Sequence, residues 1–189
     1  MKYTEEQIEN LINDQFIQNK NEIKRRLRFL LDNYTEQDQV ISPDVWYCFE
    51  EARHSFMIGN YISSIIMSAV TIERYIAKLL EMPYVAPVAQ EEAHTCNGIK
   101  LINKAFDVGI LNDEIKIKLE FLNQLRDDYV HGIDSTIHKR PQFKDPKCYI
   151  PIFLEQDNNC DLIENNAKKA ILILFQTMDS LHYTKLNYF

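Results

Sequence analysis

The stretch that decides the fold is residues 60–80, which read NYISSIIMSAVTIERYIAKLL. Its apolar residues recur every three or four positions, which is the spacing of one helical face and not the alternation of a strand. They cover well over half of the helix circumference, which predicts a position at the centre of the molecule. The apolar band comprises Ile62, Ile65, Ile66, Ala69, Val70, Ile72, Ile76, Leu79 and Leu80.

One carboxylate interrupts this band, because Glu73 lies between Ala69 and Ile76. A buried carboxylate is costly unless a cation pairs with it. Two interpretations stay open at this point. Either Glu73 lies at the edge of the band and reaches water, or it holds a cation, for which Arg126 is the candidate.

Two helices are predicted before the central one. Residues 4–7 resemble a capping box, and the helical spacing of apolar residues continues to Asp32-Asn33, as one long helix or as two short ones. Ser42-Pro43-Asp44 combines a capping serine with a proline in the first turn, which predicts a second helix that Gly59 ends.

Three more helices are predicted in the second half of the chain. A short one covers residues 99–106, with Gly98 near its start, and the next begins with Asn112 as its cap and runs to Tyr129. Asp161 and Glu164 resemble the cap of the last helix. The residues of that helix expected to face inward are Ile163, Ala167, Ala170, Ile171, Leu174, Met178 and Leu181.

The segment before the last helix, residues 133–160, holds three of the six prolines. It predicts a long irregular loop with at most one short strand, at residues 149–154, and such loops are often functional. The whole chain, residues 1–189, is therefore expected to be one all-α domain, a bundle of about five to seven helices. Residues 1–34 would form a helical extension and residues 43–183 the core bundle.

The composition narrows the class of protein. A net charge of −7 is unlike a general nucleic-acid coat protein, although it leaves room for a local basic site. No apolar run is long enough to span a membrane, and the charged start of the chain is unlike a signal peptide. The four cysteines form no C-x-x-C pair, so we expect reduced thiols in a cytoplasmic protein.

We expect neither a cofactor nor a metal. No glycine-rich phosphate loop is present, and residues 91–96, which group two glutamates with His94 and Cys96, are expected to be a polar loop and not a ligand set. Two segments are basic against the acidic average, residues 20–28 and 138–147. In the first, a solvated helix face is expected for Lys24, Arg25, Arg26 and Arg28.

The candidate site is the end of the fifth predicted helix, residues 125–132, which read LRDDYVHG. Arg126 and His131 are five residues apart, so on an ideal helix they point about 140° away from each other. Gly132 favours a helix end, where the geometry is freer and where the helix dipole and the neighbouring aspartates favour a protonated His131. A histidine that moves a proton beside a guanidinium that binds phosphate suits phosphodiester chemistry. On its own, the spacing favours a structural pairing of Arg126 with an acid.

The chain resembles the HEPN superfamily of nucleotide-binding domains over residues 43–183. The residues that carry the resemblance are Arg126-x4-His131, with Asp127 directly after the arginine, and upstream the run from Gly59 to Glu73. Many HEPN proteins are metal-independent endoribonucleases that work as dimers, in which the motifs of the two subunits meet at a two-fold cleft. The resemblance therefore implies an RNA-cleaving homodimer.

The resemblance also implies roles for the site residues. His131 would serve as general base or acid for attack by the RNA 2′-hydroxyl, Arg126 would bind the scissile phosphate, and Asp127 would orient Arg126. Glu73 and Tyr129 would support them. In a homodimer each cleft would combine Arg126 from one chain with His131 from the other, which removes the difficulty of the 140° angle. The family's setting is often a toxin, a phage-defence protein or an RNA-processing factor, sometimes with a neutralising partner protein.

The site departs from an ordinary RNA cleft because three aspartates, Asp127, Asp128 and Asp134, flank it. Cations on the following loop would offset this charge if the loop folds back over the cleft, and these expected substrate-binding residues are Lys139, Arg140, Lys144 and Lys147. Two alternatives stay open. One is a non-catalytic interaction or nucleotide-binding module that keeps the motif for dimer structure, and the other is a regulatory or antitoxin-like subunit without a site.

Overall fold

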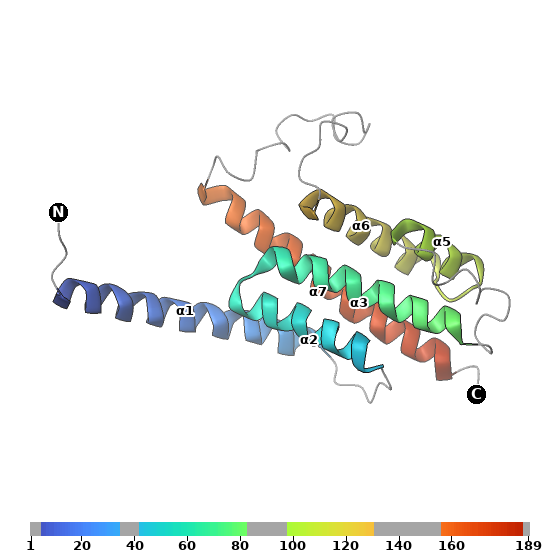
Figure 1. Ribbon diagram of the computed structural model, residues 1–189, viewed down its shortest axis with the longest axis horizontal. Coiled ribbons are helices and arrows are strands. Elements are labelled where there is room, and N and C mark those ends of the chain that lie inside the picture. Colours follow the sequence, from blue (N-terminus) through green and yellow to red (C-terminus); the bar gives the residue numbers. More distant parts are fainter. Residues whose placement is uncertain (1–4, 35–41, 83–97, 131–155, 187–189) are drawn as a thin grey trace.

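The computed structural model describes residues 5–34, 42–82, 98–130 and 156–186, which form six helices and no strand (Figure 1). The helices are α1 (Glu5–Asn33), α2 (Pro43–Ile58), α3 (Tyr61–Glu81), α5 (Gly98–Asp107), α6 (Asp113–Val130) and α7 (Gln156–Leu186). The predicted all-α helical bundle is therefore confirmed. None of the helices in these residues carries an apolar stretch that would reach across a lipid bilayer.

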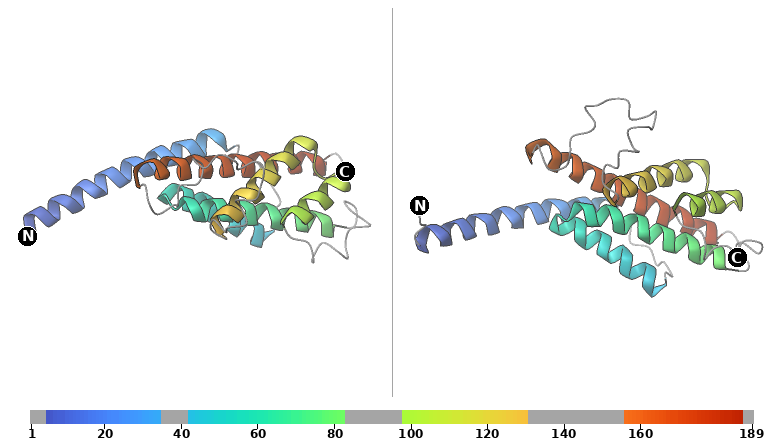
Figure 2. Two further views of the ribbon diagram at one scale, coloured as in Figure 1. Left: turned by 90° about the horizontal axis from the view of Figure 1, so that it is seen from above. Right: turned by 45° about the horizontal axis from the view of Figure 1, so that its top comes forward.

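Helix α3 lies at the centre of the bundle, where it contacts α2, α5, α6 and α7 (Figure 2). Its apolar band explains this position, because Ile65, Ile76 and Leu80 are fully buried. Each such side chain stabilises the fold by about 1.5–3 kcal/mol relative to leaving it in water. The band is narrower at its start than predicted, because Ile62 in the first turn is 36% exposed.

Three predicted helix boundaries are confirmed by their local geometry. Ser42 has extended backbone immediately before Pro43, the first residue of α2, although its side chain makes no capping hydrogen bond. Gly59 ends α2 with a φ of +86°, a left-handed conformation that costs other residues about 1–2 kcal/mol. At the start of α6, Asn112 Oδ1 accepts a hydrogen bond of 2.9 Å from the backbone N–H of Ile115.

The predicted start of the last helix is wrong. α7 begins at Gln156, and Asp161 lies on its exposed surface instead of capping it. Residues 156–160 contain neither glycine nor proline, so nothing in them stops the helix from extending by more than one turn. Ile163 is only partly buried, whereas the other residues expected to face inward are at most 2% exposed. The candidate strand at residues 149–154 lies outside the described residues.

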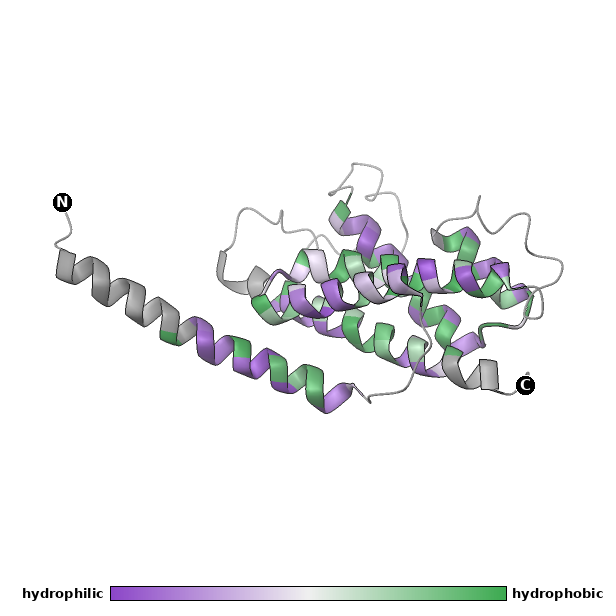
Figure 3. Cartoon of the chain, turned by 60° about the horizontal axis from the view of Figure 1, so that its bottom comes forward, coloured by the Kyte–Doolittle hydropathy of each residue, from purple (hydrophilic) through white to green (hydrophobic). Residues whose placement is uncertain are grey.

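Helix α1 is continuous through residues 19–21, so the single-helix alternative is the one observed. Its C-terminal half packs on the bundle, where Leu30 is 2% exposed and the ring of Phe29 lies 5.3 Å from that of Phe56. Its N-terminal half projects beyond the bundle (Figure 1 and Figure 2), and Figure 3 shows that the C-terminal half of α1 carries both hydrophobic and hydrophilic residues. The C-terminal half of α1 is therefore part of the bundle, and its N-terminal half is not.

Candidate functional site

Arg126 and Glu73 form an ion pair that joins α6 to α3. Arg126 Nη1 donates a short hydrogen bond to Glu73 Oε1. The two side chains are 20% and 24% exposed, so the pair is largely shielded from water. Of the two interpretations of Glu73, the structure therefore shows the second: Glu73 holds a cation, and that cation is Arg126.

Two further side chains of α6 hold the same guanidinium. Asp127 Oδ1 accepts from Arg126 Nη2 at 2.9 Å and from Nε at 3.2 Å, and Asn123 Oδ1 accepts from Nη2 at 3.0 Å. Asn123 also donates to Asp127 Oδ2 at 3.4 Å. Sequence reasoning found Asp127 but missed Asn123. The signal was available, because residues three and four positions apart on a helix lie side by side.

The first residue of α5 completes this group, which we call the Arg126 cluster: Glu73, Gly98, Asn123, Arg126 and Asp127. The backbone N–H of Gly98 donates to Glu73 Oε1 at 3.1 Å. Gly98 has a φ of +51°, and a Cβ atom there would lie 2.8 Å from Asn123 Oδ1. Glycine is therefore required both by the backbone conformation and by the space. From the sequence Gly98 was only a residue near a helix start.

The acids of the Arg126 cluster keep the guanidinium charged, and the cluster uses most of its N–H groups. Burial lowers the pKa of Arg126, but the hydrogen bonds and charges of Asp127 and Glu73 outweigh it, and the pKa is raised overall. Four of its five N–H groups have partners among the described residues. Two carboxylates surround one guanidinium, so the cluster has a net charge of −1. Binding a phosphate here therefore needs further positive charge.

Tyr129 belongs to a different contact. Its hydroxyl accepts a hydrogen bond of 3.1 Å from Asn166 Nδ2, which ties α6 to α7. Burial raises the pKa of the Tyr129 phenol. Tyr129 therefore contributes to the packing of α6 against α7, and its supporting role in the candidate site stays a prediction.

The remaining predicted site residues lie outside the described residues. α6 ends at Val130, directly before His131, and the loop cations Lys139, Arg140, Lys144 and Lys147 follow in the same undescribed segment. The same holds for the polar grouping at residues 91–96. The distance between Arg126 and His131, and the reach of the basic loop, stay predictions.

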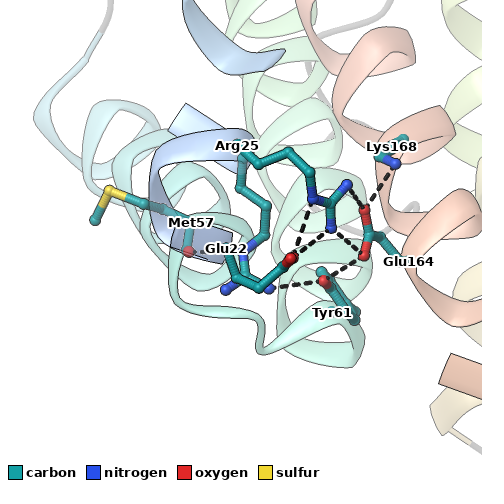
Figure 4. Close-up of polar contacts among 7 residues, drawn as sticks. Glu22, Arg25, Met57, Tyr61, Glu164 and Lys168 are labelled. Atoms are coloured by element: carbon teal, nitrogen blue, oxygen red, sulfur yellow. Dashed lines mark hydrogen bonds and ion pairs between the residues drawn. The ribbon is translucent and has the colours of Figure 1, made fainter. Parts of the chain in front are cut away.

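A second polar cluster joins α1 to α3 and α7 (Figure 4). Glu164 on α7 accepts from Arg25 Nη1 at 2.6 Å, from the Tyr61 hydroxyl at 2.7 Å and from Lys168 Nζ at 2.7 Å. Arg25 also donates to Glu22 at 2.7 Å. The hydrogen bond from Arg25 is the largest of the causes that lower the pKa of Glu164 to about 2.

This second cluster corrects the interpretation of residues 24–28 as a solvated basic face. Arg26 is 8% exposed, and its Nε donates to the Met57 carbonyl at 2.9 Å while Nη1 donates to the Tyr61 hydroxyl at 2.8 Å. The long apolar stem of an arginine can be buried when its guanidinium finds partners. Lys24 and Arg28 are exposed, as predicted.

A cavity of about 10 Å³ lies beside Glu73 and Asn123, lined mostly by apolar side chains of α3, α5 and α6. This is room for about one water molecule. This cavity beside the Arg126 cluster is therefore too small for an organic molecule.

No family model matches the chain, and neither a curated protein nor a solved structure matches it. The resemblance to HEPN proteins thus stays a prediction that rests on the sequence motif.

Proposed function

We propose that this protein is a metal-independent endoribonuclease of the HEPN type that acts as a homodimer. Arg126 binds the scissile phosphate, His131 moves the proton of the attacking 2′-hydroxyl, and Asp127 holds Arg126 in place. The observation that carries the proposal is the geometry around Arg126. Asp127 contacts the guanidinium through two hydrogen bonds at 2.9 and 3.2 Å, which is the orienting contact expected of this motif.

Fixing the guanidinium favours catalysis because a charge that is already positioned needs no reorganisation when the transition state forms. Glu73 and Asp127 approach Arg126 from α3 and from α6 itself, so the side chain is held from two directions. One N–H of Nη1 has no partner among the described residues and stays available to a phosphate oxygen.

The net negative charge of the Arg126 cluster sets a requirement for the rest of the site. A protonated His131 and the cations Lys139, Arg140, Lys144 and Lys147 must contribute positive charge when RNA binds. The proposal therefore includes a basic loop that closes over the cleft. RNA affinity should fall with salt, and neutralising the four loop cations should weaken that dependence.

A second candidate function is a non-catalytic interaction module, and one observation favours it. Four of the five N–H groups of Arg126 already have partners among the described residues. Its partner Glu73 also accepts from the Gly98 N–H, so the Arg126 cluster ties α3, α5 and α6 together. An arginine used in this way stabilises the bundle whether or not RNA is present. In this candidate the surface around α6 binds a partner protein or a nucleotide.

The setting proposed with the first candidate is cytoplasmic. A ribonuclease that nothing restrains would degrade the RNA of the cell that makes it. This fits a toxin or phage-defence protein with a neutralising partner protein.

The test is incubation of RNA with the full chain in excess chelator. Wild type should cleave, and both His131→Ala and Arg126→Lys should lose cleavage. Arg126→Lys keeps the charge but cannot make the bidentate contacts, and Arg74→Lys, at an exposed position on α3, is the matched control. Circular dichroism and molecular mass must match wild type for each variant. Absence of cleavage by the wild type would favour the interaction module.

A further inference from the structure

An open groove runs along the C-terminal half of α1, where that helix meets α7. Two contacts hold the helices together: Arg25 Nη1 donates to Glu164 at 2.6 Å, and the rings of Tyr34 and Phe175 lie 5.1 Å apart. The groove has a volume of about 610 Å³ and is lined by α1 residues between positions 21 and 33 and by Lys168 of α7. The joint between α1 and α7 therefore borders a space that these helices do not fill.

The lining of this groove is basic, although the chain as a whole has a net charge of −7. It contains four cations and one acid, which are Lys24, Arg25, Arg28, Lys168 and Asp32. Two of the cations are already used, because Arg25 and Lys168 both contact the carboxylate of Glu164 (Figure 4). The charge that remains for a ligand therefore comes from the other two cations.

Lys24 and Arg28 are these two cations. Both are exposed, and neither forms an ion pair with any residue that the structure describes. Residues four positions apart lie on the same face of a helix, and the two positions are about 6 Å apart along the axis of α1. Lys24 and Arg28 can therefore contact neighbouring anionic groups of one extended ligand.

The shape and polarity of the groove favour an extended polyanion over a small organic molecule. A pocket for a small molecule is mostly apolar and encloses most of its ligand. This groove is open, and Phe29 is the only apolar residue among the eight described residues that line it. A chain of phosphate groups, which lysine and arginine bind without contacting the bases, fits such a surface.

Helix α7 separates the groove from the candidate site. One side of α7 contacts α6, where Asn166 donates to the Tyr129 hydroxyl at 3.1 Å, and another side contacts α1, where Glu164 accepts from Arg25 at 2.6 Å. Successive residues of an α-helix are turned by about 100°, so the exposed Lys169 lies on the outer surface of α7 between these two sides. A strand that leaves the end of α6 crosses one helix, past Lys169, before it reaches the groove.

We propose that the groove binds the phosphate backbone of the RNA substrate, on the far side of α7 from the Arg126 cluster. This inference rests on the proposed function, because it assigns a second contact to the same substrate. Lys24 and Arg28 bind phosphates of the strand within the groove, and Lys169 binds a phosphate between the groove and the candidate site. These contacts add affinity without base preference, because phosphates carry no sequence information.

The separation of the groove from the candidate site makes the contribution of the groove depend on RNA length. Neighbouring helices lie about 8–10 Å apart, so α6 and α1, with α7 between them, are about 16–20 Å apart. At about 3.4 Å a nucleotide, a trinucleotide is about 10 Å long and a strand of twelve nucleotides is about 40 Å long. Only the longer RNA reaches the groove from the candidate site.

The experiment measures binding of a labelled single strand of about twelve nucleotides by fluorescence anisotropy, in a His131→Ala chain that is expected to leave the RNA intact. Adding Lys24→Gln with Arg28→Gln should weaken binding at least about fivefold at about 0.1 M salt. The same pair should reduce the slope of log affinity against log salt by about 1.4, which is about 0.7 for each lost phosphate contact. Arg74→Gln with Lys100→Gln removes two charges at exposed positions on α3 and α5, and it should change the affinity less than about twofold.

A second readout separates the groove from the candidate site. With His131 in place, Lys24→Gln with Arg28→Gln should cleave a trinucleotide as fast as wild type, because so short an RNA does not reach the groove. Circular dichroism and urea unfolding should also match wild type, since neither cation has a described ion pair to lose.

Equal affinity for the longer RNA with and without Lys24 and Arg28 would overturn the proposal. So would an equal loss in the control pair, no binding at all, or a loss of trinucleotide cleavage, which would place the effect at the candidate site. Poly-glutamate that displaces the RNA at the same charge concentration would make the groove a surface for acidic proteins and overturn the proposal equally. A wild type that cleaves neither RNA would refute the proposed function, whereas the binding measurement decides the groove.

Discussion

Replacing Glu164 by glutamine removes the charge that holds α1 against α7 while keeping the shape of the side chain. The carboxylate is 13% exposed and its pKa is lowered on folding from 4.5 to about 2. A carboxyl group of this kind stabilises the folded state above its unfolded pKa and loses that contribution as pH falls through its folded pKa. The difference between the two values corresponds to about 3 kcal/mol at pH 7. Arg25 is 46% exposed, so solvent screening reduces this to about 1–2 kcal/mol.

The assay is urea unfolding of wild type and Glu164→Gln at pH 7 and at pH 3. The variant should be less stable by about 1–2 kcal/mol at pH 7 and by less than half of that at pH 3, where the unfolded chain is already protonated at this position. Glu50→Gln is the matched control, because the Glu50 side chain is 44% exposed in its ion pair with Arg53 and should contribute less than about 0.5 kcal/mol at either pH. An equal loss at both pH values, or none at pH 7, would show that the Glu164 charge does not stabilise the fold.

Three further substitutions test the two polar clusters by urea unfolding. Gly98→Ala should lower the free energy of unfolding by about 2–3 kcal/mol, because its Cβ atom would lie 2.8 Å from Asn123 Oδ1. Gly109→Ala, with a φ of +78° and open space, should cost only the backbone strain of about 1 kcal/mol, and equal costs would contradict the crowding at Gly98. Glu73→Ala should cost about 1–3 kcal/mol and should speed hydrogen exchange of the Gly98 amide, since that amide loses its acceptor; unchanged exchange would contradict the contact. Arg26→Ala should cost about 2–4 kcal/mol through lost packing and two lost hydrogen bonds, and a loss below about 0.5 kcal/mol would show that Arg26 is solvated.

Much of the fold follows from local patterns in the sequence. The apolar band of residues 60–80 predicts a central helix because so wide a band needs contacts on several sides, and α3 has them. Gly59 and Asn112 mark helix ends by conformational and hydrogen-bonding rules that depend on few neighbours. The predicted start of α7 is wrong because a local capping pattern does not by itself end a helix on its N-terminal side. A capping pattern at Asp161 states a preference, and it does not prevent the helix from extending through Gln156.

The candidate site could be predicted only in part, because its contacts join distant segments. The pairing of Glu73 with Arg126 was open from sequence, since nothing local decides whether an acid in an apolar band meets water or a cation. Gly98 could not be given its role without knowing that α5 begins beside Glu73. Arg26 shows the same limit, because its burial depends on the Met57 carbonyl of α2 and the Tyr61 hydroxyl of α3.

In the proposed reaction, Arg126 and His131 promote attack by the RNA 2′-hydroxyl. It is tested most directly by comparing a short RNA with the same sequence carrying 2′-deoxynucleotides, both in excess chelator. We expect RNA products that end in a 2′,3′-cyclic phosphate, an intact deoxy substrate, and no products with His131→Ala. Cleavage of the deoxy substrate, or RNA cleavage that His131→Ala retains, would contradict it.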